Sequence, residues 1–376
     1  MDSRAPKPVP ALSSEVLEEI FLRIGSPADL VRASAASPAF RRLISDQSFL
    51  RTYRSLHPAP LLGLLDCNRL VFQPAEAPHP SAALARTVAR AADFSFDGCL
   101  PRVTGDWMFC ALRGGRVLFS CPRDDEEDVN WPSSFMRVPA YLAVCDPLAR
   151  RCLVLPPISD DLLASVQDDT SFRVIGRIGC KEKMAAVIFS SAAGHWTAGT
   201  SVTLDTLGMQ RSLIRTWDPS YAYGCFYWKL SCANKWLKFD MSSMEFSAVA
   251  LPSVCSRSCV IIGEAGEGRL RMFRLINDRT SLCYRVVTQI GGEWFDQLKM
   301  DNIIPLREGS WYHIHGPYDG HIFISSYQSP DERHGADTCF AVEMKTLKIE
   351  RVCQMRFCEY FNPYFSFPPF MSPRRV

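Results

Sequence analysis

The first strong pattern in the chain is a stripe of apolar residues with helical spacing. It comprises Val16, Leu17, Ile20, Phe21 and Ile24, at positions i, i+1, i+4, i+5 and i+8. A stripe with a period of about 3.6 residues predicts an amphipathic helix with one apolar face.

Further short helices are predicted directly after this stripe. Ser26-Pro27 and Ser37-Pro38 each supply a serine suited to the N-cap, followed by a proline suited to the first helical position. A later segment carries the apolar residues Phe49 and Tyr53 with the same period. We therefore predict a small bundle of three or four short helices within residues 10–57.

From about residue 94 onward the pattern changes to short apolar runs separated by Gly, Pro, Asp and Asn, which is typical of strands and turns. A weak repeat consists of a strand, a turn that begins with an acidic residue (an acid-led turn) and a second strand. It starts at Leu142, at Trp236 and, in a more degraded form, at Cys339. At about 40–50 residues per blade, the region corresponds to about six or seven blades of a β-propeller. A pair of β-sandwiches is the alternative.

The predicted fold class is therefore α+β and multidomain, with a small all-α bundle followed by an all-β propeller. We expect residues 1–9 to be a disordered N-terminus, residues 10–57 to be the helical domain and residues 61–376 to be the propeller.

Separate predictions apply to three segments of the predicted propeller. Residues 61–72 are predicted to form a first strand. The segment from Pro74 to Arg90 is rich in Pro and Ala, which favours a surface loop. The aromatic tail from Tyr360 to Phe370 is expected either to supply the closing strand of the propeller or to lie disordered.

Composition narrows the set of possible partners and compartments. A formal net charge of +2 argues against nucleic acid as a main partner. No apolar run reaches the length of about eighteen residues that a membrane-spanning helix needs, and the first residues lack the apolar core of a signal peptide. The 15 cysteines sit singly in apolar runs such as those around Cys110 and Cys145, so we expect buried free thiols. These features predict a cytoplasmic or nuclear protein that contacts no membrane.

No catalytic apparatus is apparent in the sequence. His313 and His315 would share one face of a strand, with His321 nearby, but such a pair is more typical of a polar strand face than of a metal site. The glycines between Gly263 and Gly268 have the wrong spacing for a dinucleotide-binding loop and predict a hairpin turn. We therefore expect no catalytic residues, no metal and no cofactor.

Four tryptophans lie near predicted turns, where aromatic residues often contribute to protein recognition. We expect one or two of them to line a target-binding face: Trp131, Trp196, Trp217 and Trp311.

The helical segment resembles an F-box in both residue type and spacing. The residues that carry the resemblance are Leu12, Glu15, Val16-Leu17, Ile20-Phe21, Ile24, Asp29-Leu30, Arg32-Ala33-Ser34 and Phe40 to Leu43. The sequence departs from the motif at Ser13 in place of a proline, at Ser37-Pro38 in place of Cys-Lys, and at Phe40 in place of a tryptophan.

The rest of the chain resembles the F-box-associated, Kelch-like β-propellers of plant F-box proteins. The hairpin from Val144 to Pro157, the segment from Val187 to Trp196 and the segment from Gly224 to Pro252 carry this resemblance. Together, the two resemblances imply the substrate-recognition subunit of an SCF-type (Skp–cullin–F-box) ubiquitin ligase. In such a subunit the F-box binds a Skp-type adaptor, and through it a cullin, while the propeller holds a target protein, here unknown.

Such a protein would not be an enzyme itself. The expected adaptor-binding residues are Leu12, Val16, Leu17, Ile20, Phe21, Ile24, Leu30, Phe40 and Leu43. Two alternatives are an interaction scaffold that is not part of a ligase and, less favoured, a propeller enzyme.

Overall fold

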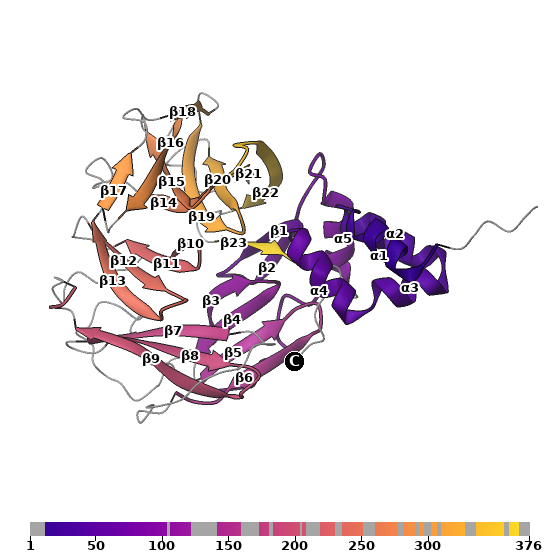
Figure 1. Cartoon of the computed structure of the whole chain (residues 1–376), viewed down its shortest axis with the longest axis horizontal. Helices are drawn as coiled ribbons and strands as arrows, with labels where there is room; N and C mark the ends of the chain where they lie inside the picture. The colour runs from indigo at the N-terminus through magenta and orange to yellow at the C-terminus, as the bar shows by residue number, and fades with distance from the viewer. Residues whose placement is uncertain are drawn as a thin grey trace, which may run out of the picture.

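The computed structural model places most of the chain in two parts, a group of helices and a ring of β-sheets (Figure 1). The structure describes residues 12–103, 106–121, 141–158, 173–179, 183–203, 205–207, 219–229, 235–250, 260–276, 281–290, 293–296, 302–306, 310–327, 336–356 and 361–367.

Four short helices form what we call the helical unit: α1 (Ser14–Leu22), α2 (Pro27–Ala36), α3 (Pro38–Ile44) and α4 (Gln47–Leu56). Each begins at a side chain that accepts a hydrogen bond from a backbone N–H of the first turn, as predicted for the two Ser-Pro pairs. These caps are Ser13, Ser26, Ser37 and Asp46. The core of the unit is made of Phe21, Leu30, Ile44, Phe49, Leu50 and Tyr53.

The β-sheets form a six-bladed β-propeller, in agreement with the predicted fold class, and all strand pairs described are antiparallel. The first blade contains β1 (Leu61–Asp66), β2 (Val71–Pro74) and β23 (Phe361–Phe365). The second contains β3 (Met108–Arg113), β4 (Arg116–Cys121), β5 (Tyr141–Asp146) and β6 (Arg151–Leu155). The third contains β7 (Arg173–Gly179), β8 (Lys183–Ser190) and β9 (His195–Thr203).

The other three blades follow in chain order around the ring. The fourth contains β10 (Ser220–Ala222), β11 (Cys225–Lys229), β12 (Lys235–Asp240) and β13 (Glu245–Ala250). The fifth contains β14 (Ile261–Gly266), β15 (Arg269–Ile276), β16 (Ser281–Ile290), β17 (Glu293–Asp296) and β18 (Asn302–Pro305). The sixth contains β19 (Trp311–Tyr318), β20 (His321–Tyr327), β21 (Ala336–Glu343) and β22 (Ile349–Arg356).

The ring is closed by the two ends of the propeller. Strand β23 pairs with β1, with Leu61 opposite Phe365 and Asp66 opposite Phe361. Of the two possibilities for the aromatic tail, the closing strand is therefore the one that the described part of the tail adopts. Just beyond β23, Phe367 packs against the core of the helical unit, with its ring centroid 6.2 Å from that of Tyr53.

The predicted acid-led hairpin is present in four blades. A carboxylate ends one strand and accepts hydrogen bonds within the turn that follows: Asp66, Asp146, Asp240 and Glu343. Four residues later, each turn has a non-glycine residue with positive φ: Leu70, Arg150, Met244 and Leu347. The sequence repeat therefore corresponds to one type of tight turn, which reverses the chain between two strands in each of these blades.

In one of these turns, the hydrogen bonds also lower the pKa of the carboxyl. At Asp240, the Ser242 hydroxyl and the N–H groups of Ser242 and Ser243 hold the pKa of the carboxyl well below its ordinary value. The ionised form is therefore the one that the turn stabilises.

Two local predictions in the first blade were wrong. Leu61 to Phe72 is a hairpin of β1 and β2 with a turn at residues 67–70, because Asp66 starts a fourth copy of the acid-led turn. The expected surface loop contains helix α5 (Ala82–Ala91), which buries Ala82, Ala85 and Val88. None of the described helices is long and apolar enough to cross a membrane.

Candidate docking surface

Helix α1 and the residue just before its N-cap carry a row of exposed apolar side chains, which we call the docking row: Leu12, Val16 and Ile20. Their exposed fractions are 56%, 43% and 45%. Val16 and Ile20 are one helical turn apart and therefore lie on the same face of α1, while Leu12 lies just before the N-cap, Ser13. A row of large exposed aliphatic residues on one element is a surface feature that needs an explanation.

The predicted adaptor-binding residues divide into three groups. The docking row is exposed. Phe21 and Leu30 are 4% and 0% exposed and belong to the core of the helical unit. The other four are half-buried and pack against that core: Leu17, Ile24, Phe40 and Leu43. Direct contact with a partner is thus possible for the docking row, whereas Phe21 and Leu30 support the bundle.

The orientation of α1 is fixed by its other face and by its C-terminal end. The ring of Phe21 meets that of Phe40 edge to face, with centroids 5.0 Å apart. The Tyr53 hydroxyl donates a hydrogen bond of 2.7 Å to the carbonyl oxygen of Ile24, and the Nε2 atom of His57 lies 2.7 Å from the carbonyl oxygen of Leu22. These contacts satisfy carbonyl groups at the end of the helix and hold the docking row outward.

Burial of the Tyr53 side chain, with a smaller contribution from the negative charge of Asp29, raises its pKa to about 12. The phenol therefore stays protonated at neutral pH, as its hydrogen bond to Ile24 requires. Tyr53 also stacks on Phe49, with ring centroids 6.1 Å apart.

Acidic side chains accompany the docking row along α1. Glu15 and Glu19 are exposed and Glu18 is half-buried. Glu19 forms an exposed ion pair with Arg23, at 2.5 Å. A partner surface with an apolar centre and a basic edge would complement this side of the helix.

The four predicted target-binding tryptophans are not gathered into one site. Trp196 is only 6% exposed, packs against Phe189 and donates a hydrogen bond of 2.7 Å to the carbonyl oxygen of Pro156. The prediction that Trp196 lines a recognition face is therefore wrong, because this residue belongs to the core. Trp311 is 38% exposed on β19, so a role in recognition stays a prediction. Trp131 and Trp217 lie outside the described residues.

The histidines of β19 make no metal-binding group within the described part of the chain. The rings of His313 and His315 are 6.4 Å apart, and the Nε2 atom of His315 lies 3.1 Å from the Ser325 hydroxyl. Burial, together with the charge of His313, lowers the pKa of His315 to about 4. The segment from Gly263 to Gly268 forms the predicted hairpin, between β14 and β15.

Sequence reasoning missed two features. Leu56, at the end of α4, is a further exposed aliphatic residue, at 58%. Three cysteines, Cys99, Cys145 and Cys152, bring their sulfur atoms together, and they are the one group of potential metal ligands found among the residues that the structure describes. The acid-led turn could have indicated that Cys145 and Cys152 face each other, but nothing in the sequence points to Cys99.

The other described cysteines follow the prediction in part. Cys225 and Cys353 are buried free thiols, as expected. Cys110 was expected to be buried and is exposed, because it lies in the irregular part of the pairing between β3 and β4.

The fold defines a β-propeller protein with a helical unit that carries exposed apolar side chains on α1. No protein-family model and no curated protein matches this sequence. Comparison with solved structures finds other proteins with 8–12% identity.

Three of these structures illustrate how distant the likeness is. An uncharacterized protein of Listeria monocytogenes has a TM-score of 0.37 and 9% identity, over 69% of this chain and 86% of that one. The SapL1 lectin, in complex with alpha methyl fucoside, has a TM-score of 0.34 and 12% identity, over 81% and 97%. AztD from Citrobacter koseri has a TM-score of 0.28 and 12% identity over 69% of this chain, which covers only 61% of AztD. TM-scores this low carry no argument about what this chain does.

Proposed function

We propose that this chain is the substrate-recognition subunit of an SCF-type ubiquitin ligase. In this proposal the helical unit is an F-box that binds a Skp-type adaptor, and through it a cullin, in the cytoplasm or the nucleus. The propeller holds a target protein, whose identity the chain does not reveal. The observation that carries the proposal is the exposed docking row on a helix whose opposite face is locked into a bundle core.

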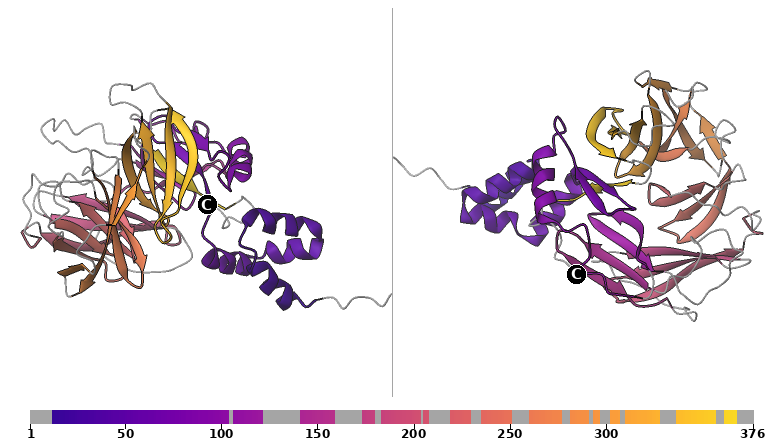
Figure 2. Two further views of the ribbon diagram at one scale, coloured as in Figure 1. Left: turned by 90° about the horizontal axis from the view of Figure 1, so that it is seen from above. Right: turned by 180° about the vertical axis from the view of Figure 1, so that it is seen from behind.

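The arrangement of the two parts supports a role in bringing two proteins together. Figure 2 shows that α1 to α4 stand to one side of the ring, so a partner on the helices would leave much of the propeller accessible. In the described part of the chain, residues 57–60 connect the two parts, and Phe367 packs on the helical core. A tethered target would meet the ubiquitin-carrying enzyme at a high effective concentration, which is how a receptor without catalytic residues accelerates the transfer.

The test is binding of purified Skp-type adaptor to the full chain and to the variant Ile20→Asp. The side chain of Ile20 is exposed in the free chain, so the substitution leaves the core of the helical unit intact. Burying a carboxylate in an apolar interface costs several kcal/mol, and each 1.4 kcal/mol is about a tenfold change in Kd. We therefore expect adaptor affinity to fall by at least about a hundredfold.

Ile303→Asp is the matched control, because Ile303 is an equally large side chain, 55% exposed, on β18 of the propeller. It should leave adaptor binding unchanged. Phe21→Asp is unsuitable, because Phe21 is buried and its loss would unfold the helical unit. If the wild-type chain does not retain the adaptor at micromolar concentrations, the proposal fails. The chain is then better interpreted as an interaction scaffold that is not part of a ligase.

A further inference from the structure

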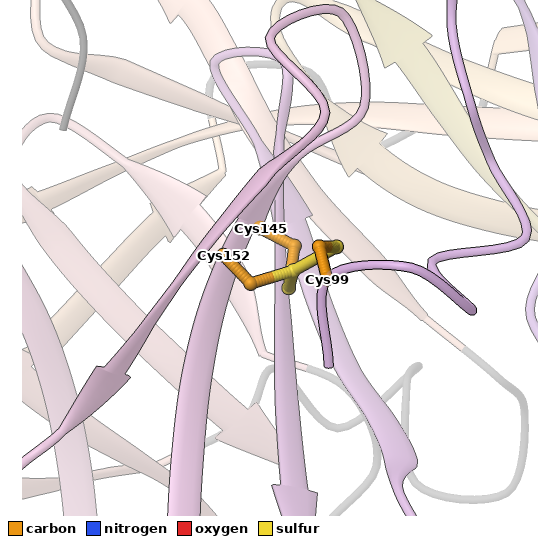
Figure 3. A group of neighbouring side chains, drawn as sticks. All are labelled: Cys99, Cys145 and Cys152. Carbon is orange, nitrogen blue, oxygen red and sulfur yellow. A yellow bond between two sulfur atoms is a disulfide. The ribbon is translucent and has the colours of Figure 1, made fainter. Parts of the chain in front are cut away.

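Three cysteines from separate segments meet in the second blade. Cys145 on β5 and Cys152 on β6 are directly opposite each other in the antiparallel pairing, with their Cα atoms 4.0 Å apart. Cys99 lies in the segment between α5 and β3, with its Cα atom 5.4 Å from that of Cys152. All three sulfur atoms lie within 4.8 Å of one another. Figure 3 shows the three side chains pointing toward one another.

The approach of Cys99 is held in place by the surrounding backbone. The N–H of Asp93 donates a hydrogen bond of 2.9 Å to the carbonyl oxygen of Pro147, in the turn between β5 and β6. In the same turn, Arg150 donates a hydrogen bond of 3.2 Å to the carbonyl oxygen of Ala91. Residues 91–93, which precede Cys99 by a few residues, are thus fastened to the hairpin that carries the other two cysteines.

Only part of the sulfur cluster is fully shielded from solvent. Cys145 is 0% exposed, and Cys99 and Cys152 are half-buried against the largest apolar core of the propeller. An apolar setting disfavours three thiolates side by side. Neutral thiols or a disulfide are the forms that this environment accommodates.

Cys152 lies close to both Cys99 and Cys145, and a sulfur atom forms only one disulfide at a time. We propose that Cys99, Cys145 and Cys152 form a thiol–disulfide exchange site in which Cys152 is the shared partner. The site has one reduced state, with three thiols, and two mutually exclusive oxidised states, each with one disulfide and one remaining thiol. It does not depend on the docking proposal.

The co-reactant is a low-molecular-weight disulfide such as oxidised glutathione. The thiolate of Cys152 attacks one sulfur of this disulfide, and the first glutathione leaves as a thiolate that takes up a proton. The thiolate of Cys99 or Cys145 then attacks the Cys152 sulfur of the mixed disulfide, and the second glutathione leaves as a thiol. Two protein thiols are oxidised and one glutathione disulfide is reduced to two thiols.

The backbone favours one of the two oxidised states. The Cα separation of Cys99 and Cys152, 5.4 Å, falls within the usual range for disulfides of about 4.4–6.8 Å, whereas the 4.0 Å separation of Cys145 and Cys152 falls below it. We therefore infer that Cys99–Cys152 is the main disulfide and that Cys145 supplies the internal thiol for exchange. In a reducing compartment such disulfides are mostly transient and regulatory.

The test uses the full chain equilibrated with reduced or oxidised glutathione, blocked with iodoacetamide and mapped by peptide mass spectrometry. Under oxidising conditions we expect the Cys99–Cys152 disulfide in most chains, with Cys145 alkylated. Cys152→Ser should abolish both disulfides, and Cys99→Ser should shift the pairing to Cys145–Cys152. Cys110→Ser, at an exposed cysteine of the same blade, should leave the map unchanged.

The wild-type map decides the proposal even if a variant does not fold. Alkylation of all three cysteines under oxidising conditions would overturn the proposal. So would a disulfide scattered over other cysteines of the chain. A purified chain that holds one Zn²⁺ or Cu⁺ ion, released when the three thiols are blocked, would also overturn it and would identify the cluster as a metal site instead.

Discussion

The neutral state of His315 makes a testable contribution to the stability of the propeller. Its ring lies 4.5 Å from that of Phe361, in the closing strand, and its Nε2 atom is within hydrogen-bond distance of the Ser325 hydroxyl. Burial, and to a smaller extent the charge of His313, lowers its pKa from the ordinary value of 6.5 to about 4. In the unfolded chain the same imidazole takes up a proton at the ordinary pKa.

The sign of the effect follows from proton uptake. Between the folded and unfolded pKa values of His315, the unfolded chain binds more protons than the folded one, so the free energy of unfolding falls as the pH is lowered through this interval. Integrating over the drop from about pH 7 to about pH 5 gives a loss of about 2 kcal/mol from this one residue. Above about pH 7 the contribution is fully present and no longer changes with pH.

Urea unfolding of the wild type and of His315→Gln measures this contribution. Glutamine does not titrate and can keep the hydrogen bond to Ser325, so we expect the variant to lose about 2 kcal/mol less than the wild type over the same pH interval. His313→Gln removes a neighbouring charge and should reduce the loss by a smaller amount. Equal losses for the wild type and His315→Gln would refute the reasoning.

Three further predictions concern stability and are measured by urea unfolding. Gly63→Ala would place a Cβ 2.2 Å from the backbone oxygen of Gln73 and should cost about 1–3 kcal/mol, whereas Gly98→Ala, with nothing within 4 Å, should change little. Met244→Gly should stabilise the chain by up to about 1 kcal/mol, because Met244 has a φ of 59°, a left-handed conformation that glycine adopts without strain. Destabilisation would show that the contacts of the Met244 side chain outweigh this backbone strain. Leu30→Ala should cost about 2–5 kcal/mol in the helical unit, and an unchanged far-UV helical signal in urea would contradict this.

The starts of the helices and the presence of a propeller could be predicted because both depend on local sequence. A serine followed by proline satisfies the first N–H groups of a helix wherever it occurs, and an acid-led turn reverses the chain within a few residues. The division of the α1 stripe could not be predicted. Val16 and Leu17 are neighbours in the sequence, and which of them faces the core depends on where α3 and α4 pack.

The missed elements rest on weak or long-range signals. Helix α5 buries two alanines and one valine, so its apolar face has little more hydrophobicity than its surroundings. The burial of Trp196 depends on a carbonyl group 40 residues away, at Pro156, and the sulfur cluster depends on a separation of 53 residues between Cys99 and Cys152. Contacts of this length follow from the assembled ring and have no local pattern in the sequence.

Closure of the ring by β23 sets an order of events during synthesis. The buried core of the helical unit comes from residues 21–53 and can form early, with Phe367 added later. Strand β1, in contrast, gains its partner only when residues 361–365 leave the ribosome. Until then one edge of β1 lacks this partner, and an edge of this kind pairs readily with a strand from another chain. The same hydrogen bonds formed between two copies would give a strand-swapped dimer, so refolding at high protein concentration should favour dimers over the closed monomer.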